Sequence, residues 1–214
     1  GVMSKEIVLG TLHHYEWVQV GGAIKHPDEG KIIDMNQSVR KDTGVKDAYL
    51  KIYPTNGYGN PDMIRQIIRM ENGVDAILHY TDPRFWGWLY QMEHELRRTM
   101  PIFYYNIWDD LPYPRWNEPF YESCDLIMNI SKQTVNIVDN VCQIKPRTDW
   151  DNTYIPHGIN ENNFYPIDSS HKEWGNLLQF RRNVTNGKDY KYIVFWNNRN
   201  IRRKLPGDVI MAYK

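Results

Sequence analysis

Four basic residues lie close together near the end of the 214-residue chain: Arg199, Arg203 and Lys204, with Arg202 in the same loop. They follow the apolar run 192–196, which predicts a strand, and they precede 207–213, which predicts the start of a helix. A loop between a strand and a helix N-terminus favours anions, because backbone N–H groups and the helix dipole attract negative charge and arginine adds paired hydrogen bonds. We therefore expect this loop to bind a diphosphate. The alternative is a solvated basic turn.

A second group of polar residues stands at the end of the apolar run 74–79: His79 is its last residue, and Asp82 and Arg84 follow it. Side chains just after a buried parallel strand emerge at the sheet edge where ligands bind, so we expect these residues to face a ligand and to bond its hydroxyl groups. Two plainer alternatives stay open. Asp82 could cap the helix that follows, and His79 could be a histidine with satisfied hydrogen bonds at a strand end.

Trp108 and Asp109 stand at the end of a third predicted strand, 102–108. Asp109 is a candidate for catalysis or for ligand binding, and the alternative is an acid of a surface turn. Asp109 and Asp110 also offer the carboxylate oxygens that divalent cations prefer. However, no residue separates them as in an Asp-x-Asp motif, so we expect no metal and no other cofactor.

Short apolar strands alternate with amphipathic helices through most of the chain, which predicts a parallel sheet with helices on both faces. The fold class expected is therefore α/β, with a Rossmann-like domain. Helix starts are indicated at Asn60-Pro61, at Asp82-Pro83 and at Ser131, and the second of these helices is expected to reach Met100. Residues 36–47 are expected to form a loop, whereas 4–12 fits either a strand or a helix. The remaining predicted strands are 16–24, 31–35, 49–53, 124–130 and a segment around Tyr154.

The segment Tyr154–Pro166 divides the chain. Its two prolines and Gly158 predict a strand end, a sharp turn in which the glycine is free to take a positive φ, and an extended linker. We therefore expect a Rossmann-like N-terminal domain at 3–155, a linker with a helix at 156–188, and the beginning of a second, truncated Rossmann-like domain at 189–214.

The same segment resembles the interdomain segment of the retaining glycosyltransferases with the B-type fold, family 4 in particular. The matching residues are Ile155, Pro156, His157, Gly158, Ile159, Asn160, Phe164 and Pro166. In this family an Arg and, five residues on, a Lys hold the nucleotide-sugar diphosphate, and Arg199 and Lys204 stand at that spacing. The resemblance also places His157 and Gly158 where the two domains face each other.

The chain departs from the family pattern in three places. Many members have a histidine near the transferred sugar, where this chain has Trp108 and Asp109. The Gly-rich loop after the first strand and the distant Glu-x7-Glu motif of the donor site are both missing. The resemblance therefore implies a fragment of a longer enzyme, and we expect the fragment alone to be inactive.

The resemblance implies a hexosyltransferase-like enzyme that transfers a sugar, with retention, from a nucleotide-diphosphate sugar to a hydroxyl of a glycan, lipid or protein acceptor. His79, Asp82, Arg84 and Trp108 would then lie on the acceptor side of the cleft. Two alternatives stay open. One is another enzyme of the same architecture, a nucleotide-sugar epimerase or a sugar phosphorylase, and the other is a non-catalytic carbohydrate-binding domain that uses Trp86, Trp108 and Trp116.

Composition narrows the setting. The formal net charge is zero, so no basic excess indicates a nucleic-acid partner. Cys124 and Cys142 are too few for a disulfide scaffold and stand in apolar patterns, so both are expected to be buried. With no apolar run of about 20 residues, we expect a cytoplasmic protein, and a peripheral membrane contact of the full-length enzyme stays open.

Overall fold

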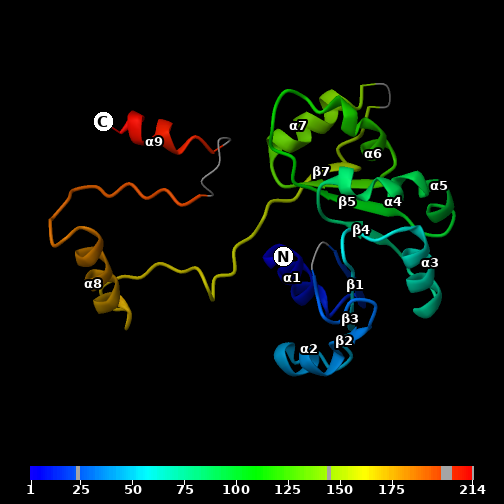
Figure 1. Cartoon of the computed structure of the whole chain (residues 1–214), viewed down its shortest axis with the longest axis horizontal. Helices are drawn as coiled ribbons and strands as arrows, with labels where there is room; N and C mark the ends of the chain where they lie inside the picture. The colour runs from blue at the N-terminus through cyan, green and yellow to red at the C-terminus, as the bar shows by residue number, and fades with distance from the viewer. Residues whose placement is uncertain (23–24, 144–145, 199–203, 214) are drawn as a thin grey trace. The chain divides into compact units, whose positions relative to one another are not determined.

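The structure is a computed structural model that describes residues 1–22, 25–143, 146–198 and 204–213 (Figure 1). The chain divides into two compact units, Gly1–Asn160 and Glu161–Lys214. The boundary between them lies within the segment 154–166. Each unit is described here by itself.

The larger sheet of the first unit has four strands, all parallel, in the order β4-β5-β6-β7. The strands are β4 (Ile77–His79), β5 (Ile102–Asn106), β6 (Leu126–Asn129) and β7 (Asn152–Tyr154). Neighbouring parallel strands must be joined by crossovers, and short helices supply them: η1 (Pro83–Trp86), α4 (Gly87–Gln91), α5 (Glu93–Leu96), η2 (Arg115–Asn117), α6 (Glu118–Glu122) and α7 (Lys132–Val141). The predicted α/β class and its parallel sheet are confirmed.

The core of this sheet joins alternate residues of the central strands to the crossover helices. Its buried members include Ile102 and Tyr104 of β5, Ile127 of β6, Tyr90 of α4, Tyr121 of α6 and Val138 of α7. Cys124 and Cys142 are buried in the same cluster, as the sequence predicts. The carboxyl ends of the strands, and the loops that follow them, are thereby held on a rigid support.

Three buried asparagines cross the larger sheet from strand to strand. Asn106 Nδ2 donates to Asn129 Oδ1 at 3.1 Å, and Asn129 Nδ2 donates to Asn152 Oδ1 at 2.7 Å. Asn152 Nδ2 donates in turn to Asp139 of α7 at 2.6 Å, while Asn106 Oδ1 accepts from the backbone N–H of Trp108 at 3.1 Å. This amide ladder links β5, β6, β7 and α7 to the loop that carries Trp108.

The smaller sheet contains β1 (Trp17–Gly21), β2 (Ile33–Asp34) and β3 (Leu50–Pro54) in the order β1-β3-β2. β1 and β3 are parallel, and β2 is antiparallel to β3. α1 (Val2–Thr11) and α2 (Asn36–Thr43) pack beside it through Val8, Leu12 and Val39. Residues 4–11 are therefore helical, and the loop predicted over 36–47 is wrong for 36–43 and confirmed for 44–47.

The three predicted helix caps are confirmed. Asn60 begins α3 (Pro61–Met70) by accepting from the Met63 N–H, and Ser131 begins α7 by accepting from the Thr134 N–H. Asp82 begins η1 by accepting from the Arg84 N–H. The single helix predicted from Asp82 to Met100 is wrong, because the backbone leaves the helical region at Trp86 and again at Met92, which gives η1, α4 and α5 instead.

The second unit contains α8 (Trp174–Val184) and α9 (Pro206–Ala212). The strand predicted over 192–196 is wrong, since the described residues 191–198 form neither helix nor strand. A strand needs a neighbour for its N–H and C=O groups, and the described part of this unit contains no other strand. No helix among the described residues is long and apolar enough to cross a membrane.

One carboxylate joins the end of α3 to the smaller sheet. The Glu71 side chain, 7% exposed, accepts hydrogen bonds from the Tyr49 and Tyr53 hydroxyls and from Lys51 Nζ at 3.2 Å. Burial by itself would raise the pKa of Glu71, but these three donors outweigh it and leave the pKa below its usual value. Folding therefore favours the ionised form of Glu71.

Glu71→Gln is expected to lower the free energy of unfolding by about 2 kcal/mol at neutral pH, because hydrogen bonds to a charged group are lost. Because the native pKa is lowered, this contribution is present above the usual Glu value of 4.5 and is lost as the pH falls below it. Urea unfolding at a series of pH values measures the difference. Asp75→Asn, at an exposed position, is the matched control. An equal loss in the two variants, or a Glu71 effect that does not shrink in acid, would contradict the assignment.

Asn129→Ala is expected to destabilise the first unit by about 3 kcal/mol, because it leaves buried polar atoms of Asn106 and Asn152 without partners. Asn136→Ala changes an exposed amide on α7 and should stay within about 0.5 kcal/mol of the parent chain. Denaturant midpoints of the two variants measure the difference. Similar midpoints would show that the ladder carries no net stability.

Candidate functional site

His79 is the last residue of β4, and its side chain is buried, with 4% exposed. Nδ1 lies 2.6 Å from the Tyr90 hydroxyl, and the ring stacks on Tyr104 with centroids 5.0 Å apart. Burial lowers the pKa of His79 to about 3, against a smaller opposing effect of the Asp82 charge. The imidazole is therefore neutral near pH 7, and in the described part of the chain its Nε2 has no hydrogen-bond partner.

Asp82 and Arg84 form an ion pair beside His79. Arg84 Nε donates to Asp82 Oδ1 at 3.0 Å, and the hydrogen bonds from Arg84 keep the pKa of Asp82 below its usual value despite partial burial. The guanidinium also lies over the Trp108 ring, 5.3 Å from its centroid. Arg84 therefore bridges the loops that follow β4 and β5.

The loop after β5 is fixed to the start of α7. Trp108 is half-buried, its indole N–H donates to the Asp110 carbonyl at 2.9 Å, and its own carbonyl accepts from Thr134 Oγ1 at 2.8 Å. Asp109 is exposed, and its backbone carbonyl accepts from Gln133 Nε2 at 3.5 Å. Trp108 thus has one defined position, and Asp109 presents its carboxylate to solvent.

The segment after β7 is held against the sheet by Tyr105. The Tyr105 hydroxyl donates to the Ile155 carbonyl at 3.0 Å, and its ring stacks on His157 with centroids 5.5 Å apart and planes 7° apart. Tyr80 also packs against Tyr105, with ring centroids 5.5 Å apart. His157 is therefore an exposed imidazole supported by a buried tyrosine.

The sharp turn predicted after Pro156 is wrong, since residues 155–160 form no turn. Gly158 does not use its freedom to take a positive φ, and a Cβ at this position would meet no atom within 4 Å. The backbone here therefore does not demand glycine.

The first unit thus brings His79, Asp82 and Arg84 together with Trp108, and places His157 on Tyr105. The predicted diphosphate residues belong to the second unit, where Lys204 is half-buried. Arg199 and Arg203 lie outside the described residues.

Sequence reasoning missed one part of this edge, an aromatic surface made by Tyr58 and Phe85. Their rings stack with centroids 4.7 Å apart and planes 8° apart, and Trp86 meets Tyr58 edge-on at 6.2 Å. The available signal was the Gly57-Tyr58-Gly59 triplet after β3. Both glycines adopt positive φ, 82° and 78°, so the turn that they form fixes the position of the tyrosine between them.

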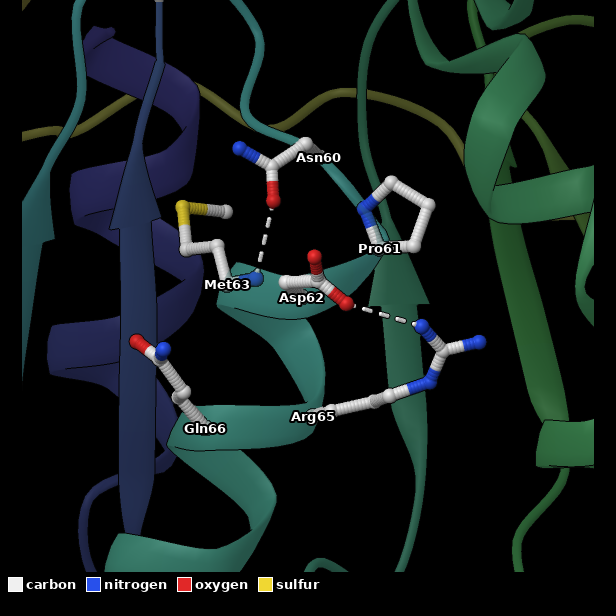
Figure 2. Close-up of a pocket in the computed structure, with 6 residues that line it drawn as sticks. All are labelled: Asn60, Pro61, Asp62, Met63, Arg65 and Gln66. Carbon is white, nitrogen blue, oxygen red and sulfur yellow. Dashed lines mark hydrogen bonds and ion pairs between the residues drawn. The ribbon is translucent and has the colours of Figure 1, made fainter.

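A depression of about 470 Å³ lies at the start of α3 (Figure 2). Figure 2 shows two pairs among the residues that line it: Asn60 accepts from the Met63 N–H, and Asp62 accepts from Arg65 at 3.0 Å. Arg65 also donates to Glu95 at 2.7 Å. The charged groups of this depression therefore pair with each other or with Glu95.

Comparison with protein-family models, with curated proteins and with solved structures gives no match. Among the described residues, no three His, Cys, Asp or Glu side chains are grouped so as to hold a metal ion. The candidate site therefore rests on the geometry of the chain itself.

The His79 imidazole should keep its neutral NMR chemical shifts between about pH 7.5 and 5, because its pKa of about 3 lies far below the usual 6.5. The same imidazole in urea-unfolded chain should titrate near 6.5, which supplies the internal control. The ring carbon-bound proton, assigned by its loss in His79→Gln, is the signal to follow. Titration of the folded chain near 6.5 would show that the ring is hydrated.

Proposed function

We propose that this chain is part of a retaining glycosyltransferase with the B-type fold. In this proposal the parallel sheet of the first unit belongs to a Rossmann-like acceptor-side domain, and residues 189–214 begin a second Rossmann-like domain that binds the nucleotide-sugar. The observation that carries it is the set of loops after β4, β5 and β7. They deliver His79, Trp108 and His157 to the carboxyl ends of parallel strands, where α/β sheets bind ligands.

The roles of the residues follow from their chemistry. Asp82, Arg84 and Asp109 are hydrogen-bonding groups suited to acceptor hydroxyls, and Asp109 is the candidate for a catalytic carboxylate because it is exposed. Arg199, Arg203 and Lys204 would neutralise the charge that develops on the departing diphosphate. His157 and Gly158 would border the cleft. Neutral His79 is suited to hydrogen bonding rather than to acting as a charged acid near pH 7.

The diphosphate leaves the sugar from the same face on which the acceptor hydroxyl arrives, so the anomeric configuration of the sugar is retained. In this scheme the glycosidic bond to the diphosphate oxygen breaks, the bond to the acceptor oxygen forms, and the acceptor proton passes to the departing diphosphate. No metal or other cofactor is required, since the cations on the chain stabilise the leaving group. Glycan, lipid and protein hydroxyls all fit as acceptors at this level.

A second candidate is a carbohydrate-binding domain without catalysis. The observation that favours it is the exposure of aromatic rings on the loops of the first unit, with 54% of Trp116 and 50% of Phe85 accessible. Such rings bind sugars without a nucleotide. The two candidates differ in whether a nucleotide-sugar is consumed.

The test is nucleoside diphosphate release from UDP-, GDP- and ADP-linked sugars by the product of the complete reading frame that encodes this chain. We expect turnover with retained anomeric configuration, and a loss of about 100-fold in kcat/KM for Lys204→Ala, as for removal of one group that stabilises the transition-state charge. Lys188→Ala, an exposed lysine in a turn of the same unit, is the control. The 214-residue chain alone should show no turnover.

Two results would contradict the proposal. One is the absence of nucleoside diphosphate release with every donor. The other is turnover that Lys204→Ala and Lys188→Ala reduce equally, since the basic loop would then have no specific part in the reaction.

A further inference from the structure

The aromatic surface of Tyr58, Phe85 and Trp86 continues into a second tryptophan. The Trp86 and Trp88 rings lie 5.4 Å apart, and the Trp88 indole N–H donates to the Tyr58 carbonyl at 3.2 Å. Tyr58 covers one face of the Phe85 ring, and half of the Phe85 side chain is accessible. The second face of Phe85 is therefore available for stacking.

Gly22, after β1, and Tyr58, after β3, both lie against the Trp86 ring. A Cβ on Gly22, after β1, would lie 3.3 Å from the Trp86 ring and 3.4 Å from the Gly57 carbonyl, after β3. Trp86 itself follows β4. The surface is therefore built by residues that follow strands of both sheets of the first unit.

Two polar atoms beside this surface have no partner in the part of the chain that the structure describes. They are Trp86 Nε1 and His79 Nε2, both buried, on rings whose centroids are 5.8 Å apart. A buried polar atom without a hydrogen bond is unfavourable, so such atoms mark places where a ligand or water hydrogen-bonds. His79 is held there from its other side by Tyr90.

The hydrogen-bonding chemistry of these two atoms limits the class of ligand that can bind them. The indole N–H can only donate, whereas His79 Nε2 donates or accepts according to how Nδ1 and the Tyr90 hydroxyl share their proton. A hydroxyl group accepts from the indole and completes either form of the imidazole. The nearest charges, Asp82 and Arg84, neutralise each other, so the surface offers no unbalanced charge to an ionic ligand.

We propose that Phe85, Trp86 and His79 form a saccharide-binding subsite, in which the apolar face of a sugar ring stacks on Phe85 and its hydroxyls bond Trp86 Nε1 and His79 Nε2. That the bound sugar is the acceptor of the transfer rests on the proposed function. Under that function, the subsite identifies the acceptor as a glycan rather than a lipid or a protein. Because both nitrogens are covered in the free chain, the half-buried Trp86 ring must move when a sugar binds.

The test is NMR of the full chain labelled with ¹⁵N at tryptophan, titrated with methyl α-glucopyranoside, methyl α-mannopyranoside and methyl β-galactopyranoside without nucleotide. We expect the Trp86 indole N–H, assigned by its loss in Trp86→Phe, to shift saturably with at least one glycoside. Phe85→Ala should raise Kd about tenfold, as expected for loss of a ring stack. Phe85→Tyr should keep the affinity, and Trp150→Ala, an exposed aromatic away from these loops, should not alter it. Circular dichroism confirms that the variants are folded.

Two results would overturn the subsite. One is a Trp86 signal that no glycoside shifts, or shifts to the same extent in Phe85→Ala. The other is a Phe85-dependent response to uridine or adenosine with none to glycosides, which would identify a nucleobase site. The subsite and the proposed function can fail separately. Glycoside binding without sugar transfer supports the subsite alone. Sugar transfer at a rate that Phe85→Ala does not change supports the proposed function and contradicts the subsite.

Discussion

The amide ladder of Asn106, Asn129 and Asn152 is the constraint on which the ligand edge depends. Each amide is buried and uses both its donor and its acceptor on a neighbouring strand, helix or loop. Such a network stabilises a single register of the strands, because a shift of one strand would leave several buried polar atoms without hydrogen-bond partners. Its end at the Trp108 N–H carries this fixed register into the loop that faces Arg84. The position of the loops at this edge therefore depends on hydrogen bonds buried between the sheet and its helices.

Asp109 has an exposed carboxylate at this edge, but the polar side chains after β4 are paired or neutral. Asp82 and Arg84 satisfy each other, and His79 is kept neutral by burial. Exposed rings lie beside them: Phe85 in η1, Trp116 in η2, and His157 supported by Tyr105. An edge of this kind recognises ligands that carry both an apolar face and hydroxyl groups, and it selects them by shape and hydrogen bonding more than by charge.

Local signals predicted local structure well. Asn60, Asp82 and Ser131 were identified as caps because a cap bonds a backbone group only two or three residues away. α2 was missed because it is polar and buries only Val39, so it shows no apolar stripe. The strand over 192–196 was wrong because a strand depends on a neighbour that a pattern does not contain. The stacking of Tyr58 on Phe85 joins separate loops, and only the packing of the two sheets reveals it.

The apolar run Tyr192–Trp196 has a consequence for how this polypeptide behaves. Its side chains are 37–81% exposed, and its backbone lies outside any helix or strand. Extended segments rich in aromatic and β-branched residues pair readily with strands of other molecules. We therefore expect this segment to be the part of the second unit that pairs with other molecules as the concentration of the chain rises.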